Sequence, residues 1–372
     1  MRAPRVRPVV IAAGGTGGHF FPAEALAVEL VSRGERVILL TDARMQARAA
    51  GFPGGEFHVL PGAGLAGRGW RPALAAAFAL ARGTLRARRI LARIEPGVVV
   101  AFGGYPAVAP TLAALSLRPR PGLVLHEQNA VLGRANRFLA PRADVLAVSF
   151  EQTRRVPQAA DWTLTGNPVR AEIAAVAARP YVAAGDAGPF RLLVLGGSLG
   201  ARVFGTVIPT ALAALPNATR KRIELALQCR AEDAADARTV LVAAGVAAEV
   251  APFFADVPER LARAHLVIAR AGASTVAELA ASGRPAILVP LPGAIDDHQS
   301  ANAAVIAAAG AGWVIAQEAL DPVELAARIG DLMANPATLS RAAACGRALG
   351  RTNAASNLAD LALSLARAEA PR

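Results

Sequence analysis

Two glycine-rich segments are placed where a phosphate group could bind. Residues 14–19 (GGTGGH) and residues 196–201 (GGSLGA) each follow an apolar run and precede a helical pattern. Glycine permits the tight turn and lets backbone N–H groups approach an anion, and a helix N-terminus adds about half a positive charge. Neither segment fits the dinucleotide pattern G-x-G-x-x-G cleanly, and the chain has no Walker lysine. A pair of such loops in matched positions suits a ligand that carries a diphosphate.

A third glycine pair occurs in residues 103–105 (GGY), directly after the apolar run at residues 98–102. Open α/β sheets bind their ligands beyond the carboxyl ends of parallel strands. We therefore expect this segment to lie at the same ligand-binding edge as residues 14–19.

The elements that position these loops follow from an alternation of short apolar runs with Ala/Leu-rich helical stretches. Such a pattern predicts parallel sheets with helices on both faces. In the first half, strands are expected at residues 9–13, 36–41, 98–102, 123–126 and 145–149. In the second half, strands are expected at residues 191–195, 223–228, 249–253, 266–269, 286–289 and 313–316.

This pattern predicts an α/β fold with two Rossmann-like domains that face each other across a cleft. We expect residues 1–168 to form the first domain and residues 169–350 the second. Residues 351–372 are expected to form a C-terminal helix that packs back on the first domain.

The bulk composition narrows the classes of function. The chain has 372 residues and a formal net charge of +12, carried almost entirely by arginine. Aromatic residues make up 5%, and no nucleic-acid motif is present, so we do not expect nucleic acid as a partner. Cys229 and Cys345 lie far apart and lack metal-site spacing. The apolar runs are too short for a membrane span or a signal peptide, which predicts a protein that stays in the cytosol.

Seven short motifs occur in order along the chain, and together they are far more specific than any one of them. They are GGTGGH (14–19), GGY (103–105), HEQN (126–129), GNPVR (166–170), GGSLGA (196–201), RAGASTVAE (270–278) and DHQSANA (297–303). This set covers nearly the whole chain and resembles the MurG family, N-acetylglucosaminyltransferases that convert lipid I to lipid II in peptidoglycan synthesis.

The resemblance implies a GT-B fold and an inverting, metal-independent hexosyltransferase without a cofactor. The donor would be UDP-N-acetylglucosamine. The acceptor would be the C4 hydroxyl of undecaprenyl-pyrophosphoryl-N-acetylmuramoyl-pentapeptide (lipid I), and the product a β-1,4 linkage. Such an enzyme serves cell-wall synthesis, cell shape and cell division on the cytoplasmic face of the inner membrane. Its partners would be the two substrates, an anionic membrane surface and other cell-wall synthesis proteins.

The resemblance also assigns donor-binding residues. Glu278 would bind the ribose hydroxyls, because a carboxylate can accept two hydrogen bonds from a vicinal diol. His298 and Gln299 would contact the sugar, and the amide of Gln299 can both donate and accept. Asn302 is expected to support this turn. The remaining donor-binding candidates are Thr16, Gly17, Gly18, Asn129, Arg170, Ser198, Phe254 and Ala273.

Catalysis and acceptor binding fall to the first half of the chain. His19 is the candidate general base, since an unperturbed imidazole titrates at about pH 6.5 and a helix N-terminus favours its neutral form. A role in positioning a phosphate fits His19 nearly as well, and Glu127 is the rival base. The acceptor-binding candidates are Gly14, Gly15, Gly104 and Tyr105. One departure from the family is the segment after GGY, which often contains Ser-Gly-Pro but here is PAVAP (106–110).

A lipid acceptor requires contact with a membrane. Trp70, Leu74, Phe78 and Leu85 recur at roughly helical spacing among arginines, and a basic amphipathic stretch suits an anionic surface. A core-facing helix with a solvated arginine face explains the same pattern equally well.

Three other functions stay open at this point. A UDP-N-acetylglucosamine 2-epimerase shares the fold, a glycolipid synthase could use diacylglycerol as the acceptor, and a non-catalytic scaffold could bind the membrane.

Overall fold

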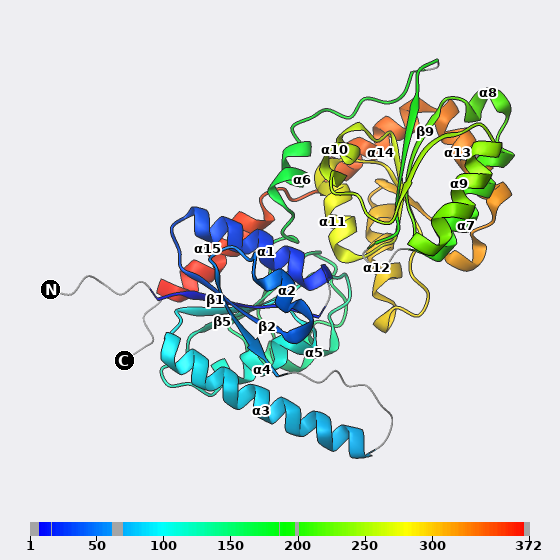
Figure 1. The fold of residues 1–372 in the computed structure, drawn as a ribbon. Helices are drawn as coiled ribbons and strands as arrows, with labels where there is room; N and C mark the ends of the chain where they lie inside the picture. Colours follow the sequence, from blue (N-terminus) through cyan, green and yellow to red (C-terminus); the bar gives the residue numbers. More distant parts are fainter. Residues whose placement is uncertain (1–6, 16, 62–69, 186, 198–200, 368–372) are drawn as a thin grey trace. The chain divides into compact units, whose positions relative to one another are not determined.

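The computed structural model describes residues 7–15, 17–61, 70–185, 187–197 and 201–367. The chain divides into two compact units (Figure 1). The first unit comprises residues 1–170 and 353–372, and the second comprises residues 171–352.

The first unit is built on a parallel sheet with the strand order β3-β2-β1-β4-β5-β6-β7. Its strands are β1 (Val9–Ala12), β2 (Val37–Asp42), β3 (Glu56–Leu60), β4 (Val98–Ala101), β5 (Gly122–Glu127), β6 (Val145–Val148) and β7 (Trp162–Leu164). Its helices are α1 (Gly17–Ser32), α2 (Gln46–Ala49), α3 (Trp70–Ile94), α4 (Gly104–Leu115), α5 (Arg134–Leu139) and α15 (Ala354–Arg367), with short 3₁₀ turns η1 (Ala43–Met45) and η2 (Ala140–Arg142).

The second unit repeats the scheme with the parallel order β10-β9-β8-β11-β12-β13. Its strands are β8 (Phe190–Leu195), β9 (Ile223–Gln228), β10 (Ala247–Ala251), β11 (Leu266–Ala269), β12 (Ala286–Leu288) and β13 (Gly312–Val314). Its helices are α6 (Ala171–Val176), α7 (Arg202–Ala214), α8 (Asn217–Arg220), α9 (Ala234–Ala243), α10 (Val257–Arg263), α11 (Ala273–Ser282), α12 (His298–Ala308), α13 (Pro322–Ala334) and α14 (Pro336–Leu349). Its 3₁₀ turns are η3 (Ala231–Asp233), η4 (Ile295–Asp297) and η5 (Gln317–Ala319).

Both sheets are buried because their central strands are apolar on both faces. Every residue of β1 and β4 is buried, and so is every residue of β11. In the first unit, one apolar layer joins the sheet to α1 and α15, and the opposite layer joins it to α3, α4 and α5. The predicted α/β fold with two Rossmann-like domains is confirmed.

The sequence-based strand assignment was wrong in two respects. It missed β3 and β7, which are edge strands with half-exposed residues and so lack a continuous apolar run. It also placed strands at residues 249–253 and 313–316, whereas β10 spans Ala247–Ala251 and β13 spans Gly312–Val314. β10 begins in exposed alanines and ends before Pro252, which has no N–H group to donate to a ladder.

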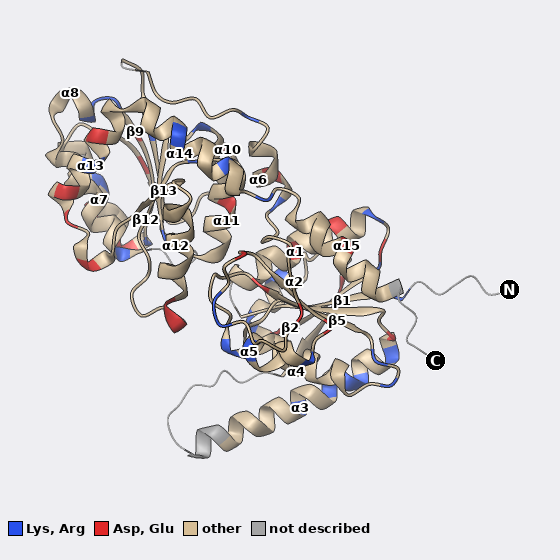
Figure 2. Ribbon diagram, turned by 180° about the vertical axis from the view of Figure 1, so that it is seen from behind, with Lys and Arg blue, Asp and Glu red and all other residues tan. Residues whose placement is uncertain are grey.

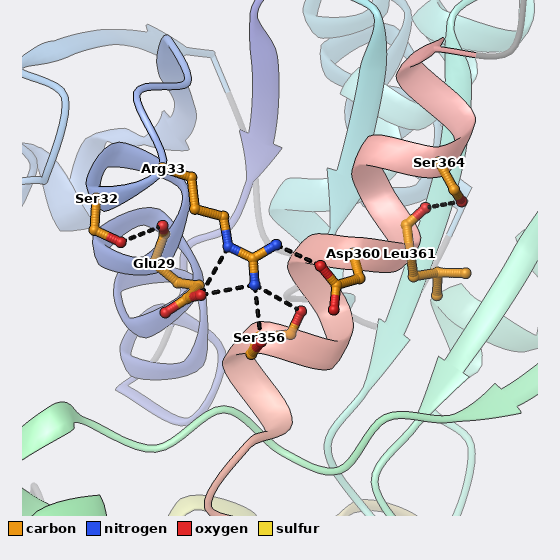
Figure 3. A network of polar contacts seen from close by, with 7 residues as sticks. All are labelled: Glu29, Ser32, Arg33, Ser356, Asp360, Leu361 and Ser364. Carbon is orange, nitrogen blue, oxygen red and sulfur yellow. Dashed lines mark hydrogen bonds and ion pairs between the residues drawn. The ribbon is translucent and has the colours of Figure 1, made fainter.

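The C-terminal helix α15 packs on α1, β4 and β5 within the first unit. Gly122 of β5 allows α15 to approach the sheet closely, because a Cβ atom on this glycine would lie 2.9 Å from Cβ of Leu365. At the edge of the interface Arg33, the residue that follows α1, donates to Asp360 and Ser356 of α15 and to Glu29 of α1 (Figure 3). The guanidinium thus ties residues more than 320 positions apart in the chain.

Candidate functional site

The glycine loops of the first unit lie beside the point where its strand order reverses. β1 leads through Gly14 and Gly15 into α1, and β4 leads through Gly103 into α4. Since β1 and β4 are neighbours, both loops lie at the carboxyl edge of the sheet, at its topological switch point. Thr16 lies outside the described residues, while Gly17 and Gly18 form the start of α1.

Gly104 brings the two loops into contact. Its φ angle is +67°, in the left-handed region that favours glycine. A Cβ atom at this position would lie 3.0 Å from Nε2 of His19. The absence of a side chain on Gly104 therefore lets the His19 ring pack closely against the start of α4. Tyr105 follows in α4 and lines a small cavity with Thr41 and Asp42 at the end of β2.

The other nitrogen of His19 is held by the HEQN motif. Nδ1 of His19 lies 2.8 Å from Oε1 of Gln128. Nε2 of Gln128 lies 2.9 Å from Nδ1 of His126, and Nε2 of His126 lies 3.0 Å from the carbonyl oxygen of Gly166. Complete burial lowers the pKa of His126 to about 4, against the opposing effect of its bond to Gly166. The sequence singled out His126 and Gln128 as motif residues but gave them no role.

Glu127, the rival base, is held in place by surrounding donors. One carboxylate oxygen accepts from the backbone N–H and the side-chain amide of Asn129, both at 3.0 Å. The other accepts from Gly133 N at 2.8 Å and from the amide of Asn136 at 3.0 Å. Glu127 is only 2% exposed. This carboxylate shapes the loop that carries Asn129, and four donors already use its lone pairs.

Arg44 is a site candidate that the sequence did not indicate. Its Nε and Nη2 donate to Oδ2 of Asp42 at 2.9 and 2.6 Å, directly after β2. Nη2 also lies 3.5 Å from the place that a Cβ atom on Gly15 would take. The buried Asp42 thus holds a largely exposed cation beside the first glycine loop. One sequence signal could have indicated Arg44. It is a cation two residues beyond the carboxyl end of β2, a strand that neighbours β1.

Arg170 ends the first unit and lies over the ring of Phe21 of α1, 5.7 Å from its centroid. The contact places this guanidinium near the N-terminal half of α1. Ser198 lies outside the described residues, and the adjacent Gly197 has a φ angle of +81°.

The donor candidates of the second unit lie beyond the carboxyl ends of its strands. Phe254 follows β10 and is 4% exposed, with the guanidinium of Arg260 4.0 Å from its ring centroid. Ala273 is the first residue of α11, after β11, and Glu278 lies half-buried on the same helix. β8 and β11 are neighbours, so Gly197 and the start of α11 flank the switch point of this sheet.

The start of α12 adopts an unusual backbone. Asp296 and Asp297 have φ angles of 54° and 52°, and two successive non-glycine residues in the left-handed region indicate stored strain. His298 donates from Nδ1 to the carbonyl oxygen of Ile295 at 2.7 Å. Oε1 of Gln299 accepts from Leu291 N at 2.9 Å, so its NH₂ group is the part suited to a ligand oxygen.

Two further residues support this turn. The buried Asn302 donates to the carbonyl oxygen of Ala271 at 3.1 Å, which links α12 to the loop before α11. Arg270 donates to the carbonyl oxygens of Val289 and Pro290 and to the side chain of Gln317. The first residue of the RAGASTVAE motif therefore clamps the loop after β12.

Helix α3 presents apolar side chains to solvent. Leu74, Phe78 and Leu85 are 62%, 66% and 56% exposed, so the alternative that they face the core is wrong. The helix packs instead through small residues such as Ala76, Gly83 and Ala87. Basic residues gather toward its C-terminal half (Figure 2). The side chain of Trp70 lies outside the described part of the structure.

Neither a membrane span nor a metal cluster is found in the part of the chain that the structure describes. Each helix there is too short or too polar to cross a lipid bilayer. Within the same residues, no group of three or more His, Cys, Asp or Glu side chains is placed to hold a metal ion.

Comparisons with known proteins agree with this organisation. The glycosyltransferase family 28 N-terminal domain matches residues 9–148, and the family's C-terminal domain matches residues 191–360. The chain is similar to the UDP-N-acetylglucosamine–N-acetylmuramyl-(pentapeptide) pyrophosphoryl-undecaprenol N-acetylglucosamine transferases of Granulibacter bethesdensis and Acidiphilium cryptum. These two proteins are 54% and 52% identical to this chain over 98% of its length. The aligned regions cover 96% and 98% of the two relatives. The crystal structure of Acinetobacter baumannii MurG aligns with a TM-score of 0.78 at 29% identity, over 96% of this chain and 99% of that one.

Proposed function

We propose that this chain, which belongs to the MurG family within glycosyltransferase family 28, transfers N-acetylglucosamine from UDP-N-acetylglucosamine to lipid I and so forms lipid II. The observation that carries the proposal is the full-length similarity to transferases of this name, at 54% identity over 98% of the chain. The motifs that support it lie at the carboxyl edges of the two sheets, where α/β folds bind ligands.

In the proposed reaction the C4 hydroxyl oxygen of the acceptor sugar attacks the anomeric carbon of the donor. The new bond forms as the bond from that carbon to the diphosphate oxygen breaks, and UDP leaves with the electron pair. The hydroxyl proton passes to Nε2 of His19, the nitrogen that faces Gly104. Attack from the face opposite the leaving group inverts the anomeric centre and gives a β-1,4 linkage.

The first unit is proposed to hold the acceptor. Backbone N–H groups of Gly14 and Gly15 and the N-terminus of α1 suit its pyrophosphate, and the Arg44 guanidinium beside Gly15 adds a positive charge. Gly104 and Tyr105 would line the sugar site. Glu127 is proposed to position Asn129 rather than to act as the base, because four donors surround its carboxylate.

The second unit is proposed to hold most of the donor. Glu278 would accept from the ribose hydroxyls, and the amide NH₂ of Gln299 would donate to a sugar hydroxyl. His298 completes the sugar site, and Phe254 and Ala273 line the uracil pocket. Ser198 of the second unit is proposed to contact the diphosphate. Arg170, Thr16, Gly17, Gly18 and Asn129 of the first unit are proposed as further donor-binding residues, and no metal ion takes part in the proposal.

We further propose that α3 rests on the anionic inner face of the cell membrane, which would make the protein peripheral. Three exposed apolar side chains, Leu74, Phe78 and Leu85, share this helix with Arg82, Arg86, Arg88, Arg89 and Arg93. Burying such side chains in the interface while arginines meet acidic headgroups stabilises a bound state.

The test is an assay with sugar-labelled UDP-N-acetylglucosamine and a water-soluble, short-chain lipid I analogue. The proposal predicts label in a disaccharide product that requires the acceptor. Release of labelled UDP-N-acetylmannosamine without acceptor would instead identify a 2-epimerase. Label transferred to diacylglycerol would identify a glycolipid synthase, and donor binding without turnover would leave the scaffold function.

A further inference from the structure

Gln128 lies between two histidines and touches both of them. Its Oε1 atom is 2.8 Å from Nδ1 of His19, and its Nε2 atom is 2.9 Å from Nδ1 of His126. We infer that Gln128 is a positioning residue which, held by His126, keeps the proton of His19 on Nδ1 and leaves the lone pair on Nε2. The importance of this arrangement rests on the proposed function, in which His19 is the base. The arrangement itself follows from hydrogen-bond geometry.

The amide orientation of Gln128 follows from its backbone neighbours. Its Nε2 atom lies 3.0 Å from the carbonyl oxygen of Phe102 and 3.2 Å from that of His126. A carbonyl oxygen only accepts, so the NH₂ group must be on this side and Oε1 must face His19. Because Oε1 also only accepts, Nδ1 of His19 must carry the proton that joins them.

His126 fixes the same direction from the other end. Its Nε2 atom faces the carbonyl oxygen of Gly166 at 3.0 Å and must therefore carry a proton. Its Nδ1 atom is then free of a proton and accepts from Gln128. A second proton on His126 would set two donors against each other. Burial, which lowers the pKa of His126 to about 4, agrees with a ring that stays neutral.

The consequence appears at the reactive edge of His19. With Nδ1–H bound to Gln128, Nε2 is the lone-pair nitrogen of the neutral ring, and this edge of the ring lies beside Gly104. An amide carbonyl does not titrate, so a proton can enter and leave the ring only at Nε2. A histidine acts as a base only in the correct tautomer. In other catalytic sites a second residue, hydrogen-bonded to the imidazole, fixes that tautomer.

Several ionisable groups on the elements around His19 are bonded to other residues. Glu127 on β5 is bonded to Asn129, Gly133 and Asn136, and Asp42 at the end of β2 is bonded to Arg44. Tyr105 lies on α4. Helix α1 itself carries Glu24 and Glu29 farther along, and Arg33, which follows this helix, is paired with Glu29 and with Asp360 of α15. Gln128 is therefore the side chain on which the tautomer of His19 depends.

The direct test is a ¹⁵N NMR spectrum of the full chain labelled at its histidines, with no substrate present. Ring ¹⁵N shifts distinguish a protonated from an unprotonated nitrogen, and a His19→Gln spectrum assigns the signals. The inference predicts the Nδ1–H form for His19 and the Nε2–H form for His126. The opposite tautomer of either ring in the wild-type spectrum would overturn it, whatever reaction the protein catalyses.

The matched variant is Gln128→Met, which keeps side-chain length but cannot accept a conventional hydrogen bond, with the exposed Gln152→Met as its control. We expect Gln128→Met to lose the fixed Nδ1–H form of His19. Loss of an orienting partner should also lower kcat by about 10–100-fold and alter the acidic limb of the pH–rate profile, while donor affinity stays unchanged.

Two results separate the inference from its premise. If Gln128→Met folds and keeps both the tautomer and kcat, the positioning role is wrong even though the transferase stands. If the wild-type protein shows the predicted tautomers but transfers no sugar, the hydrogen-bond chain stands and the proposed function fails. Should Gln128→Met not fold, the wild-type spectrum alone decides the assignment.

Discussion

Nε2 of His19 faces Gly104 so closely that a Cβ atom there would lie 3.0 Å from it. The two residues come from the loops that follow β1 and β4, on either side of the switch point of the first sheet. A general base needs an unprotonated nitrogen within reach of the hydroxyl proton, and in our proposal Nε2 of His19 is that nitrogen. Glu127, the other candidate, has both carboxylate oxygens bonded to donors of its own loop.

His19→Ala should lower kcat by about 10²–10⁴-fold if the imidazole removes the acceptor proton. Donor affinity should hardly change, since the second unit holds most of the donor in our proposal. The acidic limb of the pH–rate profile, which reports protonation of the base, should disappear. His58→Ala, a half-exposed histidine on β3, is the control. A raised acceptor KM with a surviving acidic limb would show that His19 only positions the pyrophosphate.

Glu127→Gln should affect stability more than chemistry. An amide in place of the carboxylate sets an NH₂ group against buried donors, and each unsatisfied donor costs about 1–3 kcal/mol. We expect a lower thermal midpoint for the variant but an acidic limb at the same pH. Calorimetry and a pH–rate profile measured on the same preparation check this. Complete loss of the limb with unchanged stability would move the base assignment to Glu127.

Glu278→Ala should raise the donor KM while leaving the fold intact. Losing hydrogen bonds between a charged carboxylate and the ribose should cost about 1.5–3 kcal/mol, which corresponds to roughly 10–150-fold in affinity. Titration calorimetry with UDP measures it, and Glu324→Ala on the exposed face of α13 serves as the control. Equal UDP affinity in wild type and a folded Glu278→Ala protein would contradict the ribose assignment.

The double substitution Phe78→Ser, Leu85→Ser should weaken binding to vesicles that contain acidic lipid. Burying one large apolar side chain stabilises by about 1.5–3 kcal/mol, so the loss should exceed about tenfold even if each inserts only partly. Turnover of a water-soluble acceptor should be unchanged. Val242→Ser, Val323→Ser removes two exposed valines of the second unit as a control. Equal vesicle binding by both double variants would refute the membrane role of α3.

His126 should make the stability of the first unit depend on pH. Its pKa falls from 6.5 to about 4 on folding, so between these values the unfolded chain binds a proton that the folded chain does not. The contribution of the neutral His126 ring to the free energy of unfolding is fully present above about pH 6.5, and it is lost as the pH falls toward 4. The full loss amounts to about 3 kcal/mol.

This dependence is measured by comparing urea unfolding at pH 5 and pH 7.5 in wild type and His126→Gln. The variant should lose less stability on acidification than the wild type does. His58→Gln should behave like the wild type. An identical pH response in all three proteins would show that His126 is not buried as a neutral ring.

The sequence predicted the parts of the fold that rest on continuous apolar runs. Strands β1, β4 and β11 are buried on both faces, which makes their pattern unmistakable. Edge strands β3 and β7 escaped because half-exposed residues blur the pattern. The glycine loops could be placed at strand ends because their physical use depends on that position.

The connections within the site could not be predicted, because they are long-range. His19 and Gln128 are 109 residues apart, and the sequence does not state that β1 and β5 lie in one sheet with β4 between them. Arg44 belongs to no motif and reaches the first glycine loop only because β2 pairs with β1. One of the hydrogen bonds that hold the Glu127 carboxylate comes from Asn136, which lies nine residues away on α5.

The most direct measurement of the central claim is the structure of the product. Purified protein is incubated with UDP-N-acetylglucosamine and a water-soluble lipid I analogue, and the product is examined by mass spectrometry and ¹H NMR. Our account predicts one N-acetylglucosamine added in β configuration to the C4 oxygen of the acceptor sugar, with one UDP released for each disaccharide. An α linkage, attachment at another oxygen, or conversion of the donor without transfer would contradict it.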